Sequence, residues 1–347
     1  SFLVEAGAGS GKTTALVARL VALLASGKAK PDQIAAMTFT RKAAAEMRQR
    51  LLQALEEQSQ ESSQNGATDP QVRERLRVAL MEQDRLYLGT IHAFCARLLR
   101  ERPLEAGVAA NFEELDETQD LVLARQCWDA FTEELRLRQD PLLQHLADVG
   151  LDLASLRRGF ERMLDYQDIT HWPAPAAQPP ADAGLRAELA RWHQRMDDVL
   201  ALVEGQRFTC GLLRQFARVR RHASILDLAG RVHLMDHVEL CVRKLKPLRT
   251  TQWPKGISAS QELERWEAIA EGTLRPALAQ WYAHRYPVAL TVLRRGVAFA
   301  AEQRQRLGKL NFQDLLLSAA RLLRDQPAAR RALQQRWTHL LVDEFQD

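Results

Sequence analysis

Residues 6–13 read Ala6-Gly7-Ala8-Gly9-Ser10-Gly11-Lys12-Thr13. They lie between an apolar stretch at residues 2–6, which predicts a buried strand, and a helical pattern at residues 12–25. At such a turn, glycines let backbone N–H groups face the phosphates of a nucleotide, and the helix N-terminus adds the positive end of its dipole. The stretch therefore predicts a P-loop, although Ala6 stands where the usual pattern has Gly. The alternative, a flexible Gly/Ser turn without a ligand, is disfavoured by the flanking strand and helix.

The P-loop assigns chemistry to particular side chains. Lys12 is expected to reach the β- and γ-phosphates, and the Thr13 hydroxyl is expected to ligate magnesium. ATP and Mg²⁺ are therefore the expected cofactors. The residues expected to bind the nucleotide are Ala6, Gly7, Ala8, Gly9, Ser10, Gly11, Lys12, Thr13 and Thr14.

The second half of such a site is a strand that ends in acids, and residues 339–344 provide one. The apolar run ends at Asp343 and Glu344. Asp343 is placed to hold Mg²⁺, and Glu344 is placed to orient and deprotonate the attacking water. An acidic pair after an apolar run is more often a solvated strand end. The catalytic interpretation of this pair is favoured because a P-loop is predicted at the other end of the chain.

The first hundred residues alternate strands with helices. Strands are expected at residues 34–39 and 87–91, with a helix through Glu46 and Leu55 between them. Residues 59–70 are polar and contain Gly, Asn and Pro, which predicts a surface loop. This alternation predicts a parallel sheet.

Residues 103–309 show helical spacing without strand signals, interrupted by a Pro/Ala linker at residues 172–180. The strand pattern returns at residues 339–344. The expected fold class is α/β, a P-loop NTPase core with a parallel sheet that carries a large all-α insertion domain. The expected domains are residues 1–105 for the first core segment, 106–305 for the insertion and 306–347 for the returning core segment.

The composition fits a globular protein, with 46% hydrophobic and 27% charged residues. No apolar run approaches the ~18 residues that span a bilayer, and residues 1–5 do not form a signal peptide. The four cysteines are scattered without a CxxC pair, which favours a reducing, cytoplasmic location. The net charge of +4 permits a polyanionic partner.

Four blocks of the chain resemble, in order, the first four blocks of the UvrD/Rep superfamily 1 helicases. They are residues 6–13, residues 38–47 (TFTRKAAAEM), residues 89–95 (GTIHAFC) and residues 342–347 (VDEFQD). The resemblance implies a RecA-like core and the N-terminal motor half of an ATP-dependent DNA helicase or translocase, moving 3′ to 5′, in DNA repair or recombination. It covers the two ends of the chain and little of the middle.

The resemblance also implies residue roles. Thr38, Phe39, Thr40 and Arg41 match a block that contacts single-stranded DNA, with Arg41 where many relatives have Asn. Thr90 and His92 match the next DNA-contacting block, and hydroxyls at strand ends can bind phosphates without reading sequence. Without the resemblance, Thr38 and Thr90 are explained by β-propensity. Gln346 matches a residue that couples the γ-phosphate to DNA. The expected catalytic residues are Lys12, Asp343, Glu344 and Gln346.

Residues 89–95 and 311–316 (NFQDLL) look more like the AddA/RecB recombination branch, as does the long gap between the third and fourth blocks. Beside single-stranded and duplex DNA, that branch implies one more possible partner, which is a second recombination subunit. No membrane partner is expected.

Two clusters lie in the helical region. Between residues 207 and 249 there are ten basic residues against three acids, which predicts either a duplex-binding face or a solvated helix surface. His233, His237 and Cys241 follow at intervals of four residues, so they would share a helix face. An ordinary helix face is favoured over a metal site there. The ten basic residues are Arg207, Arg214, Arg218, Arg220, Arg221, Arg231, Arg243, Lys244, Lys246 and Arg249.

Two other functions compete with the motor half. A nucleotide kinase does not explain the blocks at Thr38 and Thr90. A non-hydrolysing scaffold subunit of a recombination complex is disfavoured by intact Lys12, Thr13 and Asp343. In the family, arginine fingers come from a second motor domain beyond the fourth block. We therefore expect this chain alone to bind ATP but to hydrolyse it very slowly.

Overall fold

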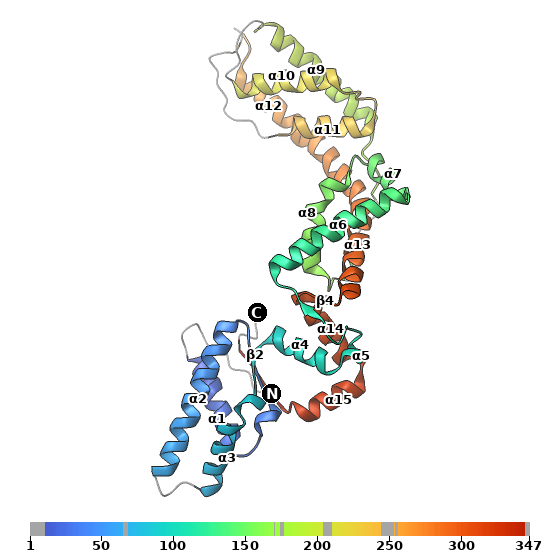
Figure 1. Ribbon diagram of the computed structural model, residues 1–347. Coiled ribbons are helices and arrows are strands. Elements are labelled where there is room, and N and C mark those ends of the chain that lie inside the picture. The colour runs from blue at the N-terminus through green and yellow to red at the C-terminus, as the bar shows by residue number, and fades with distance from the viewer. Residues whose placement is uncertain are drawn as a thin grey trace. The chain divides into compact units, whose positions relative to one another are not determined.

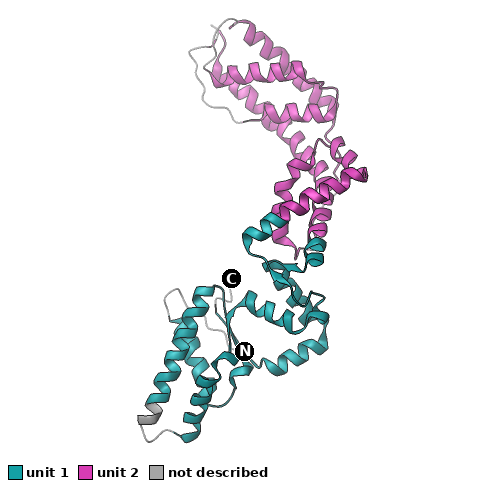
Figure 2. Cartoon of the chain, viewed as in Figure 1, with its two compact units in different colours: residues 1–123, 301–347 teal, residues 124–300 magenta. Residues whose placement is uncertain are grey.

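The computed structural model describes residues 11–64, 69–169, 171–173, 177–203, 210–243, 253 and 256–343. The chain forms two compact units (Figure 2). Unit 1 consists of residues 1–123 and 301–347, and unit 2 consists of residues 124–300. The strand expected at residues 2–6 and the P-loop residues 6–10 lie outside the described residues.

The main sheet of unit 1 is parallel, as predicted, with the order β2-β1-β5. Its strands are β1 (Ile34–Thr38), β2 (Tyr87–Thr90) and β5 (His339–Val342). Met37 pairs with Gly89 on one side and with Val342 on the other, and Thr38 pairs with Thr90. The carboxyl ends of all three strands therefore lie at one edge of the sheet.

Helices cover both faces of this sheet (Figure 1). Every residue of β1 is buried, as a central strand requires. Ile34 and Ala36 pack against α1 (Lys12–Ala25), α2 (Arg41–Gln64) and α3 (Pro70–Met81). Ala35 and Met37 point to the opposite face and pack against α4 (Ile91–Glu101) and α15 (Pro327–Arg336). The alternation follows from the two-residue period of a strand.

The surface loop expected at residues 59–70 is partly wrong. Residues 59–64 extend α2, because Gln, Glu and Ser continue a helix that is already formed. Pro70 starts α3, and the side chain of Asp69 caps this helix by accepting from the N–H of Gln71 at 2.9 Å. Only the short connection between the two helices remains; residues 65–68 lie outside the described residues.

The expectation of no strand between residues 103 and 309 is also wrong in one place. Glu113–Glu114 (β3) and Lys309–Leu310 (β4) form a two-stranded parallel sheet in unit 1. Strands of two residues are too short to produce an alternating pattern. Beside them, α5 (Pro103–Ala106) follows α4, and α14 (Phe312–Asp325) packs on α4 through Leu315 and Leu322.

In its described residues, unit 2 consists of helices and their connections, without a strand. Trp192 and Trp266 pack with Phe216 in a large apolar cluster of this unit. Gly296 lets a long helix approach Trp128, since a Cβ at this position would lie 3.0 Å from that ring. The helices are α6 (Glu117–Leu137), which begins in unit 1, α7 (Pro141–Asp148), α8 (Leu153–Met163), α9 (Asp182–Ala201), α10 (Gly211–Ile225), α11 (Arg231–Cys241), α12 (Ala259–Ile269) and α13 (Arg275–Leu307), which ends in unit 1. Short turns of 3₁₀ helix span Pro31–Gln33 and Gln83–Arg85 in unit 1 and Leu164–Tyr166 in unit 2. A π-helical turn spans Ala270–Leu274 in unit 2.

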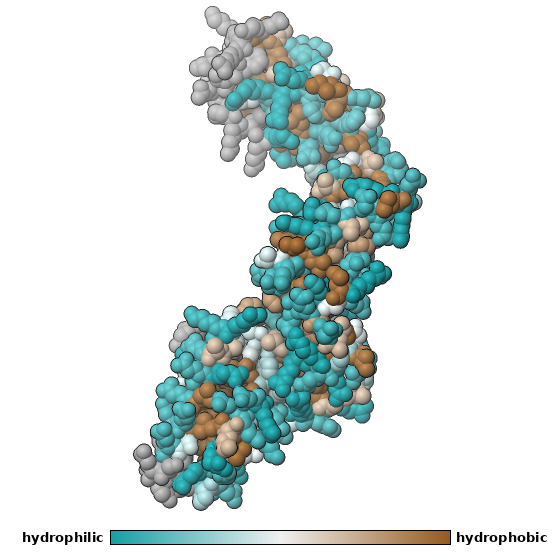
Figure 3. Space-filling model, in the orientation of Figure 1, coloured by the Kyte–Doolittle hydropathy of each residue, from teal (hydrophilic) through white to brown (hydrophobic). Residues whose placement is uncertain are grey.

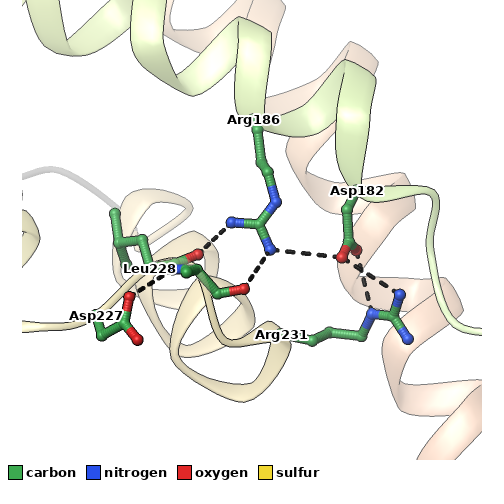
Figure 4. A network of polar contacts seen from close by, with 6 residues as sticks. Asp182, Arg186, Asp227, Leu228 and Arg231 are labelled. Carbon is green, nitrogen blue, oxygen red and sulfur yellow. Dashed lines mark hydrogen bonds and ion pairs between the residues drawn. The ribbon is translucent and has the colours of Figure 1, made fainter.

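Polar contacts fix the connection between α10 and α11. Figure 4 shows Arg186 of α9 donating to the carbonyl oxygen of Leu228, while Asp182 pairs with both Arg186 and Arg231. Arg186 also donates to the carbonyl oxygen of Ala229. Backbone carbonyls of this connection are thereby satisfied by a side chain.

Hydrophobic side chains on the face shown in Figure 3 occur in small groups separated by hydrophilic ones. Within the part of the chain that the structure describes, no helix combines the length and the apolar character needed to cross a membrane.

Candidate nucleotide and DNA site

The start of α1 has the geometry of an anion-binding helix N-terminus. Gly11 precedes it with φ of +78°, a left-handed conformation that a residue with a Cβ adopts only under strain. No described side chain caps this helix, and its first turn contains no acid. Lys12 and Thr13 are half-buried and Thr14 is exposed. The first-turn N–H groups and Lys12 together favour a phosphate.

The end of β5 places Asp343 at the carboxyl edge of the sheet. Its backbone N–H donates to the carbonyl oxygen of Met37 at 2.9 Å, so the strand pairing continues one residue past Val342. The Asp343 side chain is half-buried. Glu344 and Gln346 lie outside the described residues.

The end of β1 turns sharply into α2. Thr38 is buried, with 3% of its surface exposed, and its hydroxyl donates to the carbonyl oxygen of Thr40 at 3.0 Å. Thr40 is exposed, and its hydroxyl oxygen accepts from the N–H of Ala43 at 3.1 Å, which caps α2. Phe39 is 50% exposed, and Arg41 is exposed at the helix start.

The end of β2 repeats this arrangement at the start of α4. The hydroxyl oxygen of Thr90 accepts from the N–H of Ala93 at 3.2 Å and caps α4. The phenol of Tyr87 donates to the carbonyl oxygen of Thr90 at 2.8 Å. Gly89 is required for this bond, because a Cβ at residue 89 would lie 2.7 Å from the Tyr87 oxygen.

The N-termini of α2 and α4 therefore lie side by side at the same edge of the sheet. Thr40 and Thr90 each satisfy one N–H group with an oxygen, and each keeps a hydroxyl hydrogen that can be donated elsewhere. Both helix dipoles direct their positive ends toward this edge. The arrangement suits the phosphates of a nucleic-acid backbone and does not require contacts with bases.

His92 lies in the first turn of α4, and its ring packs against Phe312 with centroids 5.0 Å apart. Burial lowers the pKa of His92 below its ordinary value and so favours the neutral ring. A neutral imidazole offers one donor and one acceptor.

Sequence reasoning missed two residues of this site. Tyr87 supports Thr90 from within the same strand, and its only sequence signal is an aromatic residue two positions before Gly89. Phe312 lies in the stretch at residues 311–316 that suggested a branch of the family, but no contact with His92 was predicted from it. This contact joins positions more than two hundred residues apart, which local patterns do not report.

The structure divides the basic cluster of unit 2. Arg220 pairs with Asp197 at 2.6 Å, and Arg231 pairs with Asp182 at 3.1 Å. Arg214, Arg218 and Arg221 instead occupy exposed positions of α10 at intervals of four and three, and thus share one helix face. No ion pair joins these three to a described acid. Arg207, Lys244, Lys246 and Arg249 lie outside the described residues.

The helical spacing of His233, His237 and Cys241 does not produce a metal site. His233 is exposed and contacts the carbonyl oxygen of Asp227, whereas His237 is fully buried and contacts two other histidines, His193 and His222. Within the described ranges, no group of three or more His, Cys, Asp or Glu is arranged to hold a metal ion. Burial also raises the pKa of Cys241 to about 12, which disfavours a thiolate ligand.

His237 takes part in a different cluster. Its Nε2 lies 2.9 Å from Nε2 of His193 on α9, and its Nδ1 lies 3.0 Å from Nδ1 of His222 on α10. The three rings thereby join three helices. Burial lowers the pKa of His193 and of His237 to about 4, and the nearby Arg220 acts in the same direction.

A helix start preceded by a left-handed glycine, and an acidic strand end at the same edge of a parallel sheet, are typical of P-loop NTPases. Comparison with known families agrees with this class. Residues 1–347 match the UvrD/REP helicase N-terminal domain, and the chain belongs to that family. The family resemblance indicated by the four sequence blocks is thereby confirmed.

Individual relatives are similar over parts of the chain. The chain is 36% identical over 184 residues to a subunit of the ATP-dependent helicase/nuclease of Desulforudis audaxviator (strain MP104C), covering 50% of this chain and 14% of that protein. It is 38% identical over 132 residues to the corresponding protein from Latilactobacillus sakei subsp. sakei (strain 23K), covering 38% and 14%. With DNA helicase II of Escherichia coli (strain K12) it shares 36% identity over 126 residues, covering 36% and 14%. The match thus spans about a seventh of each relative's length.

Proposed function

We propose that this chain is the ATP-binding half of a DNA helicase or translocase motor that acts 3′ to 5′ in DNA repair or recombination. The observation that carries the proposal is the hydrogen bond from Asp343 N–H to the Met37 carbonyl oxygen. It ties the strand end predicted to hold Mg²⁺ to the residue directly before Thr38. ATP chemistry at the end of β5 and DNA contact at the end of β1 would thus lie on two neighbouring, hydrogen-bonded strands.

The nucleotide half of the site would bind ATP with Mg²⁺. Backbone N–H groups from residue 6 to the first turn of α1 would hold the phosphates, and Lys12 would neutralise the β- and γ-phosphates. Thr13 and Asp343 would ligate the metal ion. Glu344 would orient and deprotonate water, and Gln346 would couple the γ-phosphate to the DNA contacts.

The DNA half of the site would bind the backbone of a single strand at the two capped helix starts. Thr40, Thr90 and His92 would donate to phosphates, and exposed Phe39 would pack against a sugar or base. The buried Thr38 would hold the turn, because its hydroxyl is already used by the Thr40 carbonyl. Arg41 would add charge at the start of α2.

Duplex DNA would contact unit 2 through Arg214, Arg218 and Arg221. These side chains form one exposed basic stripe of α10, and phosphate contacts of this kind bind DNA without sequence preference. Two of the relatives named above are subunits of a helicase/nuclease. A second recombination subunit is therefore also proposed as a partner.

The motor cycle would also require an arginine finger at the γ-phosphate. In NTPases an arginine finger contributes about 10³–10⁵ in rate. The resemblance implies that such arginines come from a second motor domain. The 347-residue polypeptide by itself should therefore bind ATP and turn it over very slowly, with little stimulation by DNA.

Coupling between the two halves gives the test. Affinity for fluorescent oligo-dT is measured by anisotropy with and without Mg²⁺ and a non-hydrolysable ATP analogue. We expect the analogue to change the dissociation constant about three- to tenfold, a typical coupling between two sites. Identical affinities in both conditions would leave a scaffold that binds nucleotide without a motor role as the better account.

A further inference from the structure

A buried ion pair lies beside the start of α14 in unit 1. Arg304, near the end of α13, is only 1% exposed. Its Nε donates to one carboxylate oxygen of Asp314 at 2.6 Å, and a second guanidinium nitrogen donates to the other oxygen at 3.1 Å. A two-point contact of this kind fixes the orientation of both planar groups.

Asp314 also belongs to the cap of α14. Its side chain accepts from the N–H of Asn311 at 3.3 Å, and the Asn311 side chain accepts from the N–H of Asp314 at 2.8 Å. The amide of Asn311 donates to Asp120 on α6 at 2.9 Å. Side chains from α13 and α6 thus hold the first turn of α14 in place.

Phe312 is the first residue of this turn and directly follows the Asn311 cap. It is 38% exposed, and its ring packs on His92 at 5.0 Å. Behind this contact, α14 and α4 are joined by a buried apolar interface that includes Leu99, Leu315 and Leu322. The position of Phe312 therefore limits the orientations open to His92.

We propose that the Arg304–Asp314 ion pair is a positioning device that sets the His92 side chain for DNA binding, acting through Asn311 and Phe312. The inference rests on the proposed function, in which His92 contacts single-stranded DNA. A role in stability alone explains the pair poorly, because an apolar pair of similar volume is often as stable as a buried ion pair. What the ion pair adds is a fixed side-chain geometry at Asp314, two residues after Phe312.

The test replaces the pair without leaving a buried charge. Arg304→Met with Asp314→Asn keeps volume and an oxygen for the cap, and Phe312→Ala removes the contact while keeping the pair. His92 is followed by NMR titration of ¹³C-labelled histidine, assigned with His92→Gln. In both variants we expect the pKa of His92 to rise toward its ordinary value and oligo-dT affinity to fall about three- to tenfold, with ATP-analogue affinity unchanged.

The matched control is Arg195→Met with Glu262→Gln, which removes another ion pair with a buried carboxylate, in unit 2. It should change neither the His92 titration nor oligo-dT affinity. An unchanged His92 titration in both the Arg304/Asp314 and the Phe312 variants would overturn the positioning role. His92→Gln is the separate test of the proposed function. If it leaves oligo-dT affinity intact, His92 is not a DNA contact, and the titration still decides whether the ion pair positions it.

Discussion

Polar side chains serve opposite purposes at the sheet edge of unit 1 and between the helices of unit 2. At the sheet edge, Thr40 and Thr90 use one lone pair to cap a helix and stay accessible for a further partner. In unit 2, His193, His222 and His237 use their nitrogens on each other and join three helices. Polar groups that serve the fold make their hydrogen bonds within the protein, and those that serve a ligand keep a donor or acceptor unused.

A group of packed aromatic rings supports the sheet edge. Beneath the sheet edge, Tyr87, Phe94 and Trp337 pack ring against ring, with centroids 5.0 to 6.3 Å apart. The guanidinium groups of Arg97 and Arg336 lie over the Trp337 ring at 5.1 and 4.9 Å. The aromatic group holds Tyr87, which in turn holds the Thr90 carbonyl.

The largest effect should follow from removing this support. Trp337→Ala should lower the free energy of unfolding by about 3–5 kcal/mol, because a large buried ring leaves a cavity. Urea denaturation measures the loss. Trp172→Ala, at a half-exposed residue of unit 2, should cost about 1 kcal/mol or less. Equal costs at the two positions would show that the aromatic group is not the support of the sheet edge.

Removing the charge at the nucleotide site should have the next largest effect. Lys12→Ala should weaken ATP binding by about 1.5–3 kcal/mol, because a charge-assisted phosphate contact is lost. Titration calorimetry with Mg²⁺ and a non-hydrolysable analogue measures the change. Lys28→Ala removes an exposed lysine beyond the other end of α1 and is the control. Unchanged affinity in Lys12→Ala would place the nucleotide elsewhere.

Acid should destabilise unit 2 in particular, because the histidine cluster with lowered pKa values lies in this unit. Above pH 6.5, His193 and His237 are neutral in both the folded and the unfolded protein. As the pH falls toward 4, the unfolded chain binds protons that the folded cluster does not, because burial holds both pKa values at about 4. Stability should therefore decline by about 1–2 kcal/mol between pH 6.5 and 4, after an allowance for solvent screening.

Urea midpoints measured across this range check the decline. The charged groups that face the cluster, Arg220 and Asp197, pair with each other at 2.6 Å. His193→Gln with His237→Gln should flatten this part of the profile, whereas His145→Gln, at an exposed position of α7, should not. A profile that keeps its slope in the double variant would assign the acid sensitivity to other groups.

The sequence predicted the sheet edge far better than unit 2. Residues 12–25 form the expected helix, and the strands at Ile34, Tyr87 and His339 lie where their apolar runs placed them. These features are local, since a strand end or a glycine turn needs only neighbouring residues. Two other features, the Phe312–His92 contact and the histidine cluster of unit 2, depend on helices that pack over long sequence separations. Such packing cannot be recognised from the local pattern of a single sequence.

The smallest predicted effect distinguishes a ligand-binding cation from a structural one within unit 2. Arg218 lies on the exposed stripe of α10, whereas Arg220, two residues away, is 31% exposed and paired with Asp197. If the stripe binds duplex phosphates, Arg218→Gln should reduce the slope of log K against log salt by about 0.9, the value for one released counterion. Arg220→Gln should leave the slope unchanged, because its charge is already neutralised. Anisotropy titrations of a labelled duplex at several salt concentrations measure both slopes. Equal slopes in Arg218→Gln and the parent chain would return the stripe to ordinary solvated surface, while a slope lost in both variants would show that the Asp197 pair opens to admit DNA.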